Sequence, residues 1–490
     1  MLVTEELLHL CEQDIRAGRA QEAARRLSRV NTAKIPRHLR LPLAQLCRRA
    51  NLISLGAKVL TPVIQASRES RHHDVSPQEF AEYASLLQRI GAVQEALSTL
   101  KQVDAGKTPD AHLFTAFCHF QLWDYEKALP SLEAYVASDL PAYWRFVGRV
   151  NLAAALVALG RYDRAMPLIG SDIEYAAKEG YSRLQGNLLE LRAQALVMMK
   201  DVDAAKRDLE SAMSVFGMEN TPDQFFVKKW QAILNAAESG SIDSLKAFRA
   251  EALSRDDWES VRDADLRMLK IDFEMERFEH LLFGTPFAAY RKRILTEIGR
   301  TPSSESFVLG QGPCFDVLTG QVEGRELLNM GKKGHQLLEI LLRDFYRPLR
   351  IGSIFAELFP GEYFDIFSSP MRVHSVIKRL RAWFEEHGLP LEISEFGSNY
   401  RLVKTGEFSF RVPLERRAIE GHHAYFEKLR LAYQGGGSIT TSAAREVLGM
   451  TPTSFKRFAS WALENGLMAR EGNGRATTYK IVDPGFSRAA

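Results

Sequence analysis

The sequence is poor in cysteine. Its 490 residues include only Cys11, Cys47, Cys118 and Cys314, and no two of them have the spacing of a CxxC pair. This spacing argues against a disulfide framework and against a zinc cluster, and it fits a reducing compartment.

Long apolar runs are also missing. No stretch approaches the roughly 18 residues that a membrane-spanning helix needs. The N-terminus carries Glu5 and Glu6 where a signal peptide has a basic flank and an apolar core. We therefore expect a soluble, cytoplasmic protein that does not contact a membrane.

Sequence motifs for catalysis are missing too. There is no Walker loop, no GxGxxG after a strand, no HExxH and no GxSxG. The pairs His72-His73 and His422-His423 are adjacent, so on a helix their side chains diverge by about 100° and do not chelate as i,i+4 pairs do. We expect no enzyme activity, no cofactor and no metal site.

Charge is balanced overall but not along the chain. The net charge is +3, and residues 1–300 contain 40 Lys and Arg against 40 Asp and Glu. Residues 301–400 carry a net charge of −3, and residues 401–490 carry +6. The basic C-terminal end is a mild indication of a polyanionic partner.

The first 298 residues contain a repeated phrase in which one helix ends, the chain turns, and the next helix begins with an inward-facing alanine. The intervals are 34, 39, 32, 37 and 40 residues, and the alanines are Ala23, Ala57, Ala96, Ala128, Ala165 and Ala205. Such a period is typical of helical hairpins that stack into a solenoid, because one hairpin cannot bury its own apolar face.

The phrase resembles the tetratricopeptide repeat (TPR). The likeness is clearest in Phe120, Tyr125 and Ala128, and again in Leu159, Gly160, Tyr162 and Ala165. This resemblance implies a TPR-like domain over residues 1–298 that binds an effector peptide or a partner protein. A pure scaffold and a small-molecule sensor are the alternatives.

Residues 299–313, GRTPSSESFVLGQGP, have the composition of a linker. After them, residues 314–404 change to the order strand, three helices and hairpin that is typical of a winged helix. On the third helix, Val373, Ile377, Leu380 and Phe384 predict one buried stripe. Residues 371–383 contain no acid, so the rest of this helix predicts a basic face that fits the major groove of DNA.

This segment resembles the DNA-binding domain of OmpR/PhoB-type regulators. The likeness rests on Val373, Ile377 and Lys378-Arg379-Leu380-Arg381 in the recognition helix, and on Gly397, Tyr400, Arg401 and Leu402 in the wing. The candidate DNA contacts are Arg372, His374, Ser375, Lys378, Arg379, Arg381, Asn399 and Arg401. Arg379 or Arg381 has the alternative role of bracing the fold.

Residues 405–434 are interpreted as a connecting helix, and residues 435–486 as a second winged-helix domain. Thr451 is the expected N-cap of its second helix, and Gly472-Asn473-Gly474 predict the tip of its wing. The candidate DNA contacts here are Thr453, Ser454, Lys456, Arg457, Arg470 and Arg475.

The sequence thus predicts a mainly α protein, with an α-solenoid followed by two α+β winged-helix domains. The favoured function is that of a bacterial, DNA-binding transcriptional regulator whose repeats sense an effector. Duplex DNA is the expected partner, and RNA polymerase and a second copy of the chain are further candidates. The alternative is a non-enzymatic scaffold in which repeats and winged helices all bind protein.

Overall fold

The computed structural model describes residues 2–16, 19–69, 75–217, 222–323, 325–326, 328, 331–414, 421–433, 437–472 and 477–482. The chain forms two compact units. Unit 1 comprises Met1–Leu281, Thr285–Thr301 and Leu349–Arg372. Unit 2 comprises Leu282–Gly284, Pro302–Pro348 and Val373–Ala490.

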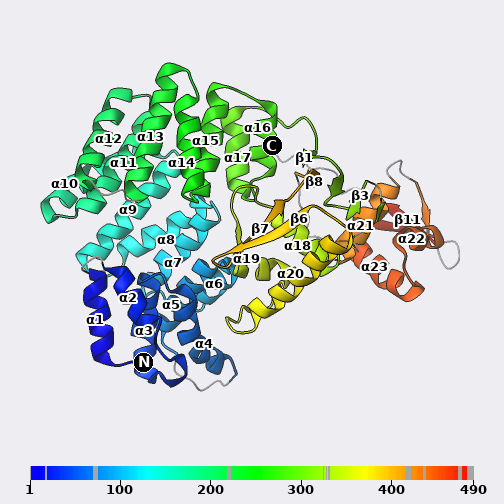
Figure 1. The fold of residues 1–490 in the computed structure, drawn as a ribbon, viewed down its shortest axis with the longest axis horizontal. Coiled ribbons are helices and arrows are strands. Elements are labelled where there is room, and N and C mark those ends of the chain that lie inside the picture. Colours follow the sequence, from blue (N-terminus) through cyan, green and yellow to red (C-terminus); the bar gives the residue numbers. More distant parts are fainter. Residues whose placement is uncertain are drawn as a thin grey trace. The chain divides into compact units, whose positions relative to one another are not determined.

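Unit 1 is a run of antiparallel helical hairpins, coloured blue to green in Figure 1. The helices are α1 (Glu5–Arg16), α2 (Ala20–Leu27), α3 (Arg40–Arg49), α4 (Ile53–Glu69), α5 (Pro77–Ile90), α6 (Val93–Leu100), α7 (Asp110–Gln121), α8 (Tyr125–Ala137), α9 (Ala142–Ala158), α10 (Tyr162–Glu179), α11 (Ser182–Met198), α12 (Val202–Phe216), α13 (Pro222–Ser239), α14 (Asp243–Ser254), α15 (Trp258–Ile271), α16 (Met275–Phe283) and α17 (Ala288–Ile298). Two 3₁₀ turns, η1 (Thr32–Lys34) and η2 (Arg37–Leu39), join α2 to α3.

The repeat alanines explain the hairpin packing. The six predicted positions are at most 1% exposed, and they are Ala23, Ala57, Ala96, Ala128, Ala165 and Ala205. Their small side chains let the paired helices approach closely. Asp124, Asp201 and Asp257 each accept a backbone hydrogen bond that starts the next helix. The expected solenoid of helical hairpins is confirmed.

Unit 1 also contains a segment from far along the chain. The strand β5 (Leu349–Arg350) and the helix α19 (Ile351–Leu358) belong to it, together with the first residues of α20 (Ser369–Glu386). The helix predicted at 350–359 is therefore present, but it packs with the repeats.

A five-stranded sheet organises the start of unit 2. It contains β1 (Ser306–Gln311), β2 (Cys314–Asp316), β3 (Gln321–Val322), β4 (Arg325–Glu326) and β8 (Phe408–Pro413), in the order β1-β8-β2-β3-β4. β8 pairs antiparallel with β1 and parallel with β2.

This sheet corrects two expected segments. The interpretation of residues 299–313 as a linker is wrong where β1 lies, and residues 408–413 of the expected connecting helix form a strand. The reason is apolar burial: Phe307, Phe408, Phe410 and Val412 lie in the core, and this outweighs the Ser- and Gly-rich composition around β1.

The rest of the first winged segment in unit 2 is α18 (Lys333–Leu341), most of α20, and a hairpin of β6 (Leu391–Phe396) and β7 (Asn399–Lys404). Gly397 and Ser398 turn the hairpin with φ values of 55° and 63°. Both lie in the left-handed region that a two-residue type I′ turn requires.

The C-terminal part of unit 2 has the element order of a winged helix. It consists of α21 (Gly421–Ala432), β9 (Ile439–Thr440), α22 (Thr441–Leu448), α23 (Pro452–Glu464), β10 (Met468–Glu471) and β11 (Thr478–Ile481), with the sheet order β10-β11-β9. Phe426 and Leu429 of α21 join the same core as Phe455, Phe458 and Tyr479. The expected connecting helix is therefore, in part, the first helix of this domain.

Candidate nucleic-acid interface

Helix α20 has the predicted two faces. Val373, Ile377, Leu380 and Phe384 are at most 2% exposed, as the spacing indicated. Ser375, Lys378 and Arg379 are exposed on the other face. The Arg379 Nε donates to the Ser375 carbonyl at 3.2 Å, which leaves the rest of its guanidinium at the surface.

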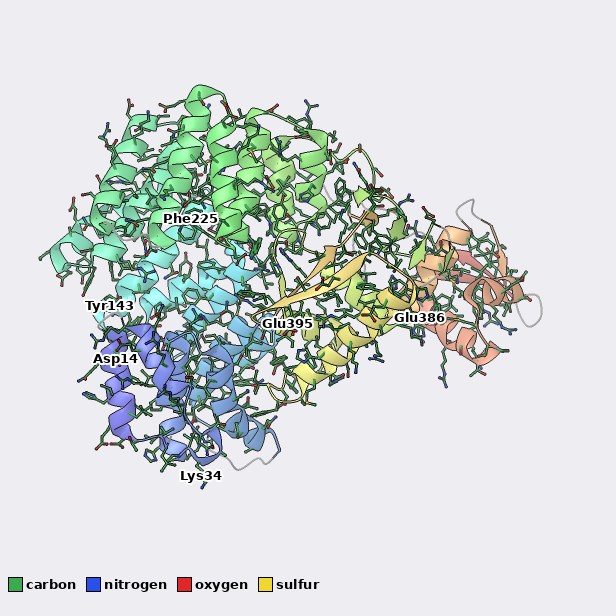
Figure 2. The ribbon with its side chains drawn as sticks, in the orientation of Figure 1. Asp14, Lys34, Tyr143, Phe225, Glu386 and Glu395 are labelled. Atoms are coloured by element: carbon green, nitrogen blue, oxygen red, sulfur yellow. The ribbon has the colours of Figure 1, made fainter. Side chains whose placement is uncertain are left out.

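The His374 ring is tied to the wing. Its Nε2 lies 2.8 Å from the Tyr400 hydroxyl, and that hydroxyl donates to Oε1 of Glu395 at 2.8 Å. Because the hydroxyl proton of Tyr400 goes to Glu395, the His374 Nε2 donates to the Tyr400 hydroxyl oxygen. Burial and Glu395, labelled in Figure 2, raise the pKa of Tyr400. His374 positions the wing in addition to facing solvent.

Two other predicted arginines are engaged with protein groups. Arg372 pairs with Glu362 and lies over the Phe359 ring, with its guanidinium carbon 3.9 Å from the ring centroid. The Arg381 Nη2 donates to the Ile393 carbonyl at 2.6 Å, so Arg381 connects α20 to β6. Of the two bracing candidates, Arg381 takes that role.

The wing of this segment ends in an exposed tip. The Asn399 side chain donates to the carbonyls of Phe396 and Gly397, each at 3.2 Å, which holds the turn closed. Arg401 is exposed on β7, and Phe396 is 82% exposed.

Helix α23 presents a polar, cationic face. Thr451 caps it by accepting from the Ser454 N–H, as predicted. Phe455, Ala459 and Ala462 are buried, as is Phe458. The candidates Thr453, Ser454, Lys456 and Arg457 are all exposed. No acid occurs between Glu446 and Glu464.

The wing of the C-terminal domain is described in part. The exposed Arg470 has its Nη2 3.4 Å from the Thr477 hydroxyl. Lys480 pairs with Glu471 at 2.8 Å and thereby lowers the pKa of that carboxyl. Arg475 and the predicted Asn473-Gly474 turn lie outside the described residues.

Sequence reasoning missed how α19 packs within unit 1. A Cβ at Gly352 would lie 2.8 Å from the Ile90 carbonyl oxygen and 2.9 Å from the Ala92 nitrogen, so only glycine fits against the turn between α5 and α6. Glu95 accepts from the Phe364 N–H, and Gln65 donates to Asp365. No periodicity reveals contacts between segments about 260 to 300 residues apart.

Distant repeats also meet. The Trp123 indole, in the turn before α8, donates to Oε2 of Glu259 on α15 at 3.1 Å. The Trp123 and Tyr290 rings pack in a T-shaped arrangement, with centroids 4.5 Å apart, and Tyr290 belongs to α17. Beside these contacts, Arg262 is fully buried and Asp263 is nearly so. These contacts join the turn before α8 to α15 and α17.

Over the described ranges, no three His, Cys, Asp or Glu side chains gather as metal ligands. In the same ranges, no helix is long and apolar enough to cross a membrane.

No family model matches the chain. No curated protein matches it either. Among solved structures, it is similar to a tetratricopeptide repeat protein from Parabacteroides merdae ATCC 43184, with a TM-score of 0.34 and 16% identity over 60% of this chain and 97% of that one. The hairpin architecture described above rests on the contacts of this chain itself.

Proposed function

We propose that the protein is a cytoplasmic, DNA-binding transcriptional regulator, and that α23 is its principal reading helix. The observation that carries this proposal is the exposed set Thr453, Ser454, Lys456 and Arg457 on the second helix of a helix–turn–helix. Lys and Arg reach guanine edges and phosphates, and hydroxyls add contacts to either.

The first winged segment supplies a smaller contact in this proposal. Ser375, Lys378 and Arg379 of α20 are exposed, as is Arg401 on the wing, where Asn399 is half-buried. Residues 301–400 have a net charge of −3, which weakens the attraction of this segment to phosphates. The likeness to OmpR/PhoB-type domains supports DNA contact by α20.

The repeats, in this proposal, bind an effector peptide or a partner protein. Trp123, in the turn before α8, packs against Tyr290 of α17 and donates to Glu259 of α15, so we assign the effector to another surface of the solenoid. Tyr143 of α9, 42% exposed, and Trp144, 51% exposed, offer an aromatic surface beside Tyr181.

A second candidate function is a protein-interaction scaffold. It is favoured by exposed apolar side chains just before and at the start of α20: Tyr363 is 60% exposed, Phe367 50% and Met371 70%. Exposed large apolar groups that cluster in one segment are typical of protein contacts.

The deciding experiment measures binding of the full chain to duplex DNA by fluorescence anisotropy across a salt series. We expect Lys456→Ala/Arg457→Ala to weaken binding at least about tenfold and to reduce the salt slope by about 2, since two phosphate or base contacts are lost. Lys404→Ala/Arg411→Ala removes two exposed cations of the same unit outside α20 and α23 and is the matched control.

Equal losses in both double variants would show diffuse attraction and would reject α23 as the reading helix. If the full chain forms no complex with duplex DNA even at low ionic strength, the scaffold becomes the favoured function.

A further inference from the structure

The N-terminal end of unit 1 is strongly basic, although the first 300 residues are neutral in sum. Residues 23–68 contain ten Lys and Arg and no Asp or Glu. Residues 1–68 carry a net charge of +7, and residues 69–300 carry −7. The two charges cancel, which conceals the concentration of cations in α2, η1, η2, α3 and α4.

The segment Ser28–Arg40, called here the basic loop, is ordered by apolar anchors. Val30, Ile35 and Leu39 are at most 8% exposed, and the Asn31 side chain accepts from the Ala33 N–H to start η1. The polar residues between the anchors therefore face outward. In Figure 2, Lys34 projects from the lower edge of the blue hairpins.

Four of the ten cations are neutralised by acids from outside the acid-free segment. Arg37 pairs with Glu79 and Arg48 with Glu82, and two further pairs are Arg26–Asp14 and Arg49–Glu12. The partner acids Asp14, Glu79 and Glu82 are almost fully buried. These pairs hold neighbouring helices together, so we assign them a structural role.

Other cations of the segment face solvent. Arg25, Lys34 and Lys58 are exposed, and within the described part of the chain no ion pair joins them to a carboxylate. Arg40 donates to the Val59 carbonyl at 2.8 Å, which places the end of the basic loop beside Lys58. Arg29 and His38 are also exposed there.

The chemistry of this surface selects the partner. Cations that outnumber acids in one segment attract a polyanion of high linear charge density, and duplex DNA carries one charge per about 1.7 Å of axis. Residues 23–68 contain no Phe, Tyr or Trp, so the segment has no platform on which unpaired bases stack. Both features favour the backbone of a duplex over single strands.

We propose that the basic loop, with Arg25 and Lys58, binds the phosphate backbone of duplex DNA independently of sequence. This inference rests on the proposed function, to which it adds a DNA contact outside the winged helices. Its role is to strengthen attachment on any sequence, whereas α23 selects the site.

The test compares the full chain with Arg25→Glu/Lys34→Glu/Lys58→Glu. Lys101→Glu/Lys178→Glu/Lys246→Glu is the matched control, because it makes the same charge change at exposed positions of unit 1. Anisotropy is measured on two duplexes of unrelated sequence across a salt series, and thermal unfolding checks that both variants are folded.

We expect the basic-loop variant to bind both duplexes on the order of tenfold more weakly or worse. Its salt slope should fall by about 2 to 3, since three phosphate contacts are lost. The control should stay close to wild type. If the Glu variant does not fold, Arg25→Gln/Lys34→Gln/Lys58→Gln should give a smaller loss in the same direction.

Equal behaviour of variant and control overturns the proposal. So does a variant that loses binding to poly-glutamate but keeps its DNA affinity, which would identify an acidic protein as the partner. If Lys456→Ala/Arg457→Ala has no effect while the basic-loop variant is impaired, α23 is not the reader and the backbone contact stands.

Discussion

The Ser353 hydroxyl donates a hydrogen bond of 3.0 Å to the carbonyl oxygen of Gly91, across 262 residues of chain. A second link is close by, since the Arg350 Nη1 donates to the Arg89 carbonyl at 2.8 Å. These contacts fix α19 on the turn between α5 and α6. A ligand that moved this turn would therefore also move the helix that precedes α20 in the chain.

The close approach at Gly352 predicts an unusual sensitivity to a single methyl group. Gly352→Ala should destabilise unit 1 by about 1–3 kcal/mol, because the added Cβ meets backbone atoms that cannot rotate away. Gly170→Ala is the matched control, since nothing lies within 4 Å of a Cβ there. That substitution, inside α10, should stabilise the helix by about 0.5–1 kcal/mol. Urea unfolding measures both, and a stabilising Gly352→Ala would show that α19 is not packed as described.

Much of the architecture was predictable because local chemistry determines it. The repeat alanines, the Thr451 cap and the apolar stripe from Val373 to Phe384 depend on residues within one or two turns. The sheet containing β1 and β8 was not predictable in this way, since Phe307 and Val412 pair over about 100 residues. The docking of Gly352 depends on backbone shape, which periodicity does not report.

The candidate site shows the same division. Helical spacing located the exposed faces of α20 and α23, but it did not separate Arg372, which pairs with Glu362, from Arg379, which bonds to a backbone carbonyl. The basic segment at 23–68 was readable in the sequence. Averaging charge over 300 residues concealed it, because the acidic residues that compensate lie outside those 46 positions.

Arg372 and Arg379 should respond differently to truncation. Arg379→Ala should weaken DNA binding about three- to tenfold with little change in stability, since its side chain faces solvent. Arg372→Ala should leave DNA affinity within about twofold and lower stability by about 0.5–1 kcal/mol, the value of a cation–π contact at a partly exposed site. Anisotropy and urea unfolding separate the two effects, and a DNA defect confined to Arg372→Ala would contradict the assignment.

Arg381 should act through the wing. Arg381→Ala removes the donor to the Ile393 carbonyl and should cost about 1 kcal/mol of local stability. We expect faster amide hydrogen exchange in β6 and β7, with α23 unaffected. Arg401→Ala, on the same hairpin but exposed, is the control. Unchanged exchange in the hairpin would mean that the bond does not hold the wing.

The fully buried His335 predicts a pH dependence of unit 2. Its Nδ1 accepts from the Gly331 N–H at 3.0 Å, so Nε2 carries the proton and donates to the Val317 carbonyl at 2.7 Å. Burial lowers the pKa of His335 below its usual 6.5, because the charged ring would lose its hydration. Protonation would also turn Nδ1 into a donor that faces another donor.

The direction of the effect follows from linkage. Between the lowered folded pKa and 6.5, the unfolded chain binds a proton at this residue that the folded chain does not. The contribution of neutral His335 to the free energy of unfolding is therefore complete above about pH 6.5. It is lost as the pH falls towards the pKa of His335 in the folded state, with a slope of up to about 1.4 kcal/mol per pH unit. His335→Gln keeps one donor and one acceptor but does not titrate. It should lower stability at pH 7.5 and remove this contribution to the slope between pH 6.5 and 5, as measured by urea unfolding at each pH. His38→Gln, at an exposed position, is the control, and an unchanged slope in His335→Gln would show that His335 is not the group responsible.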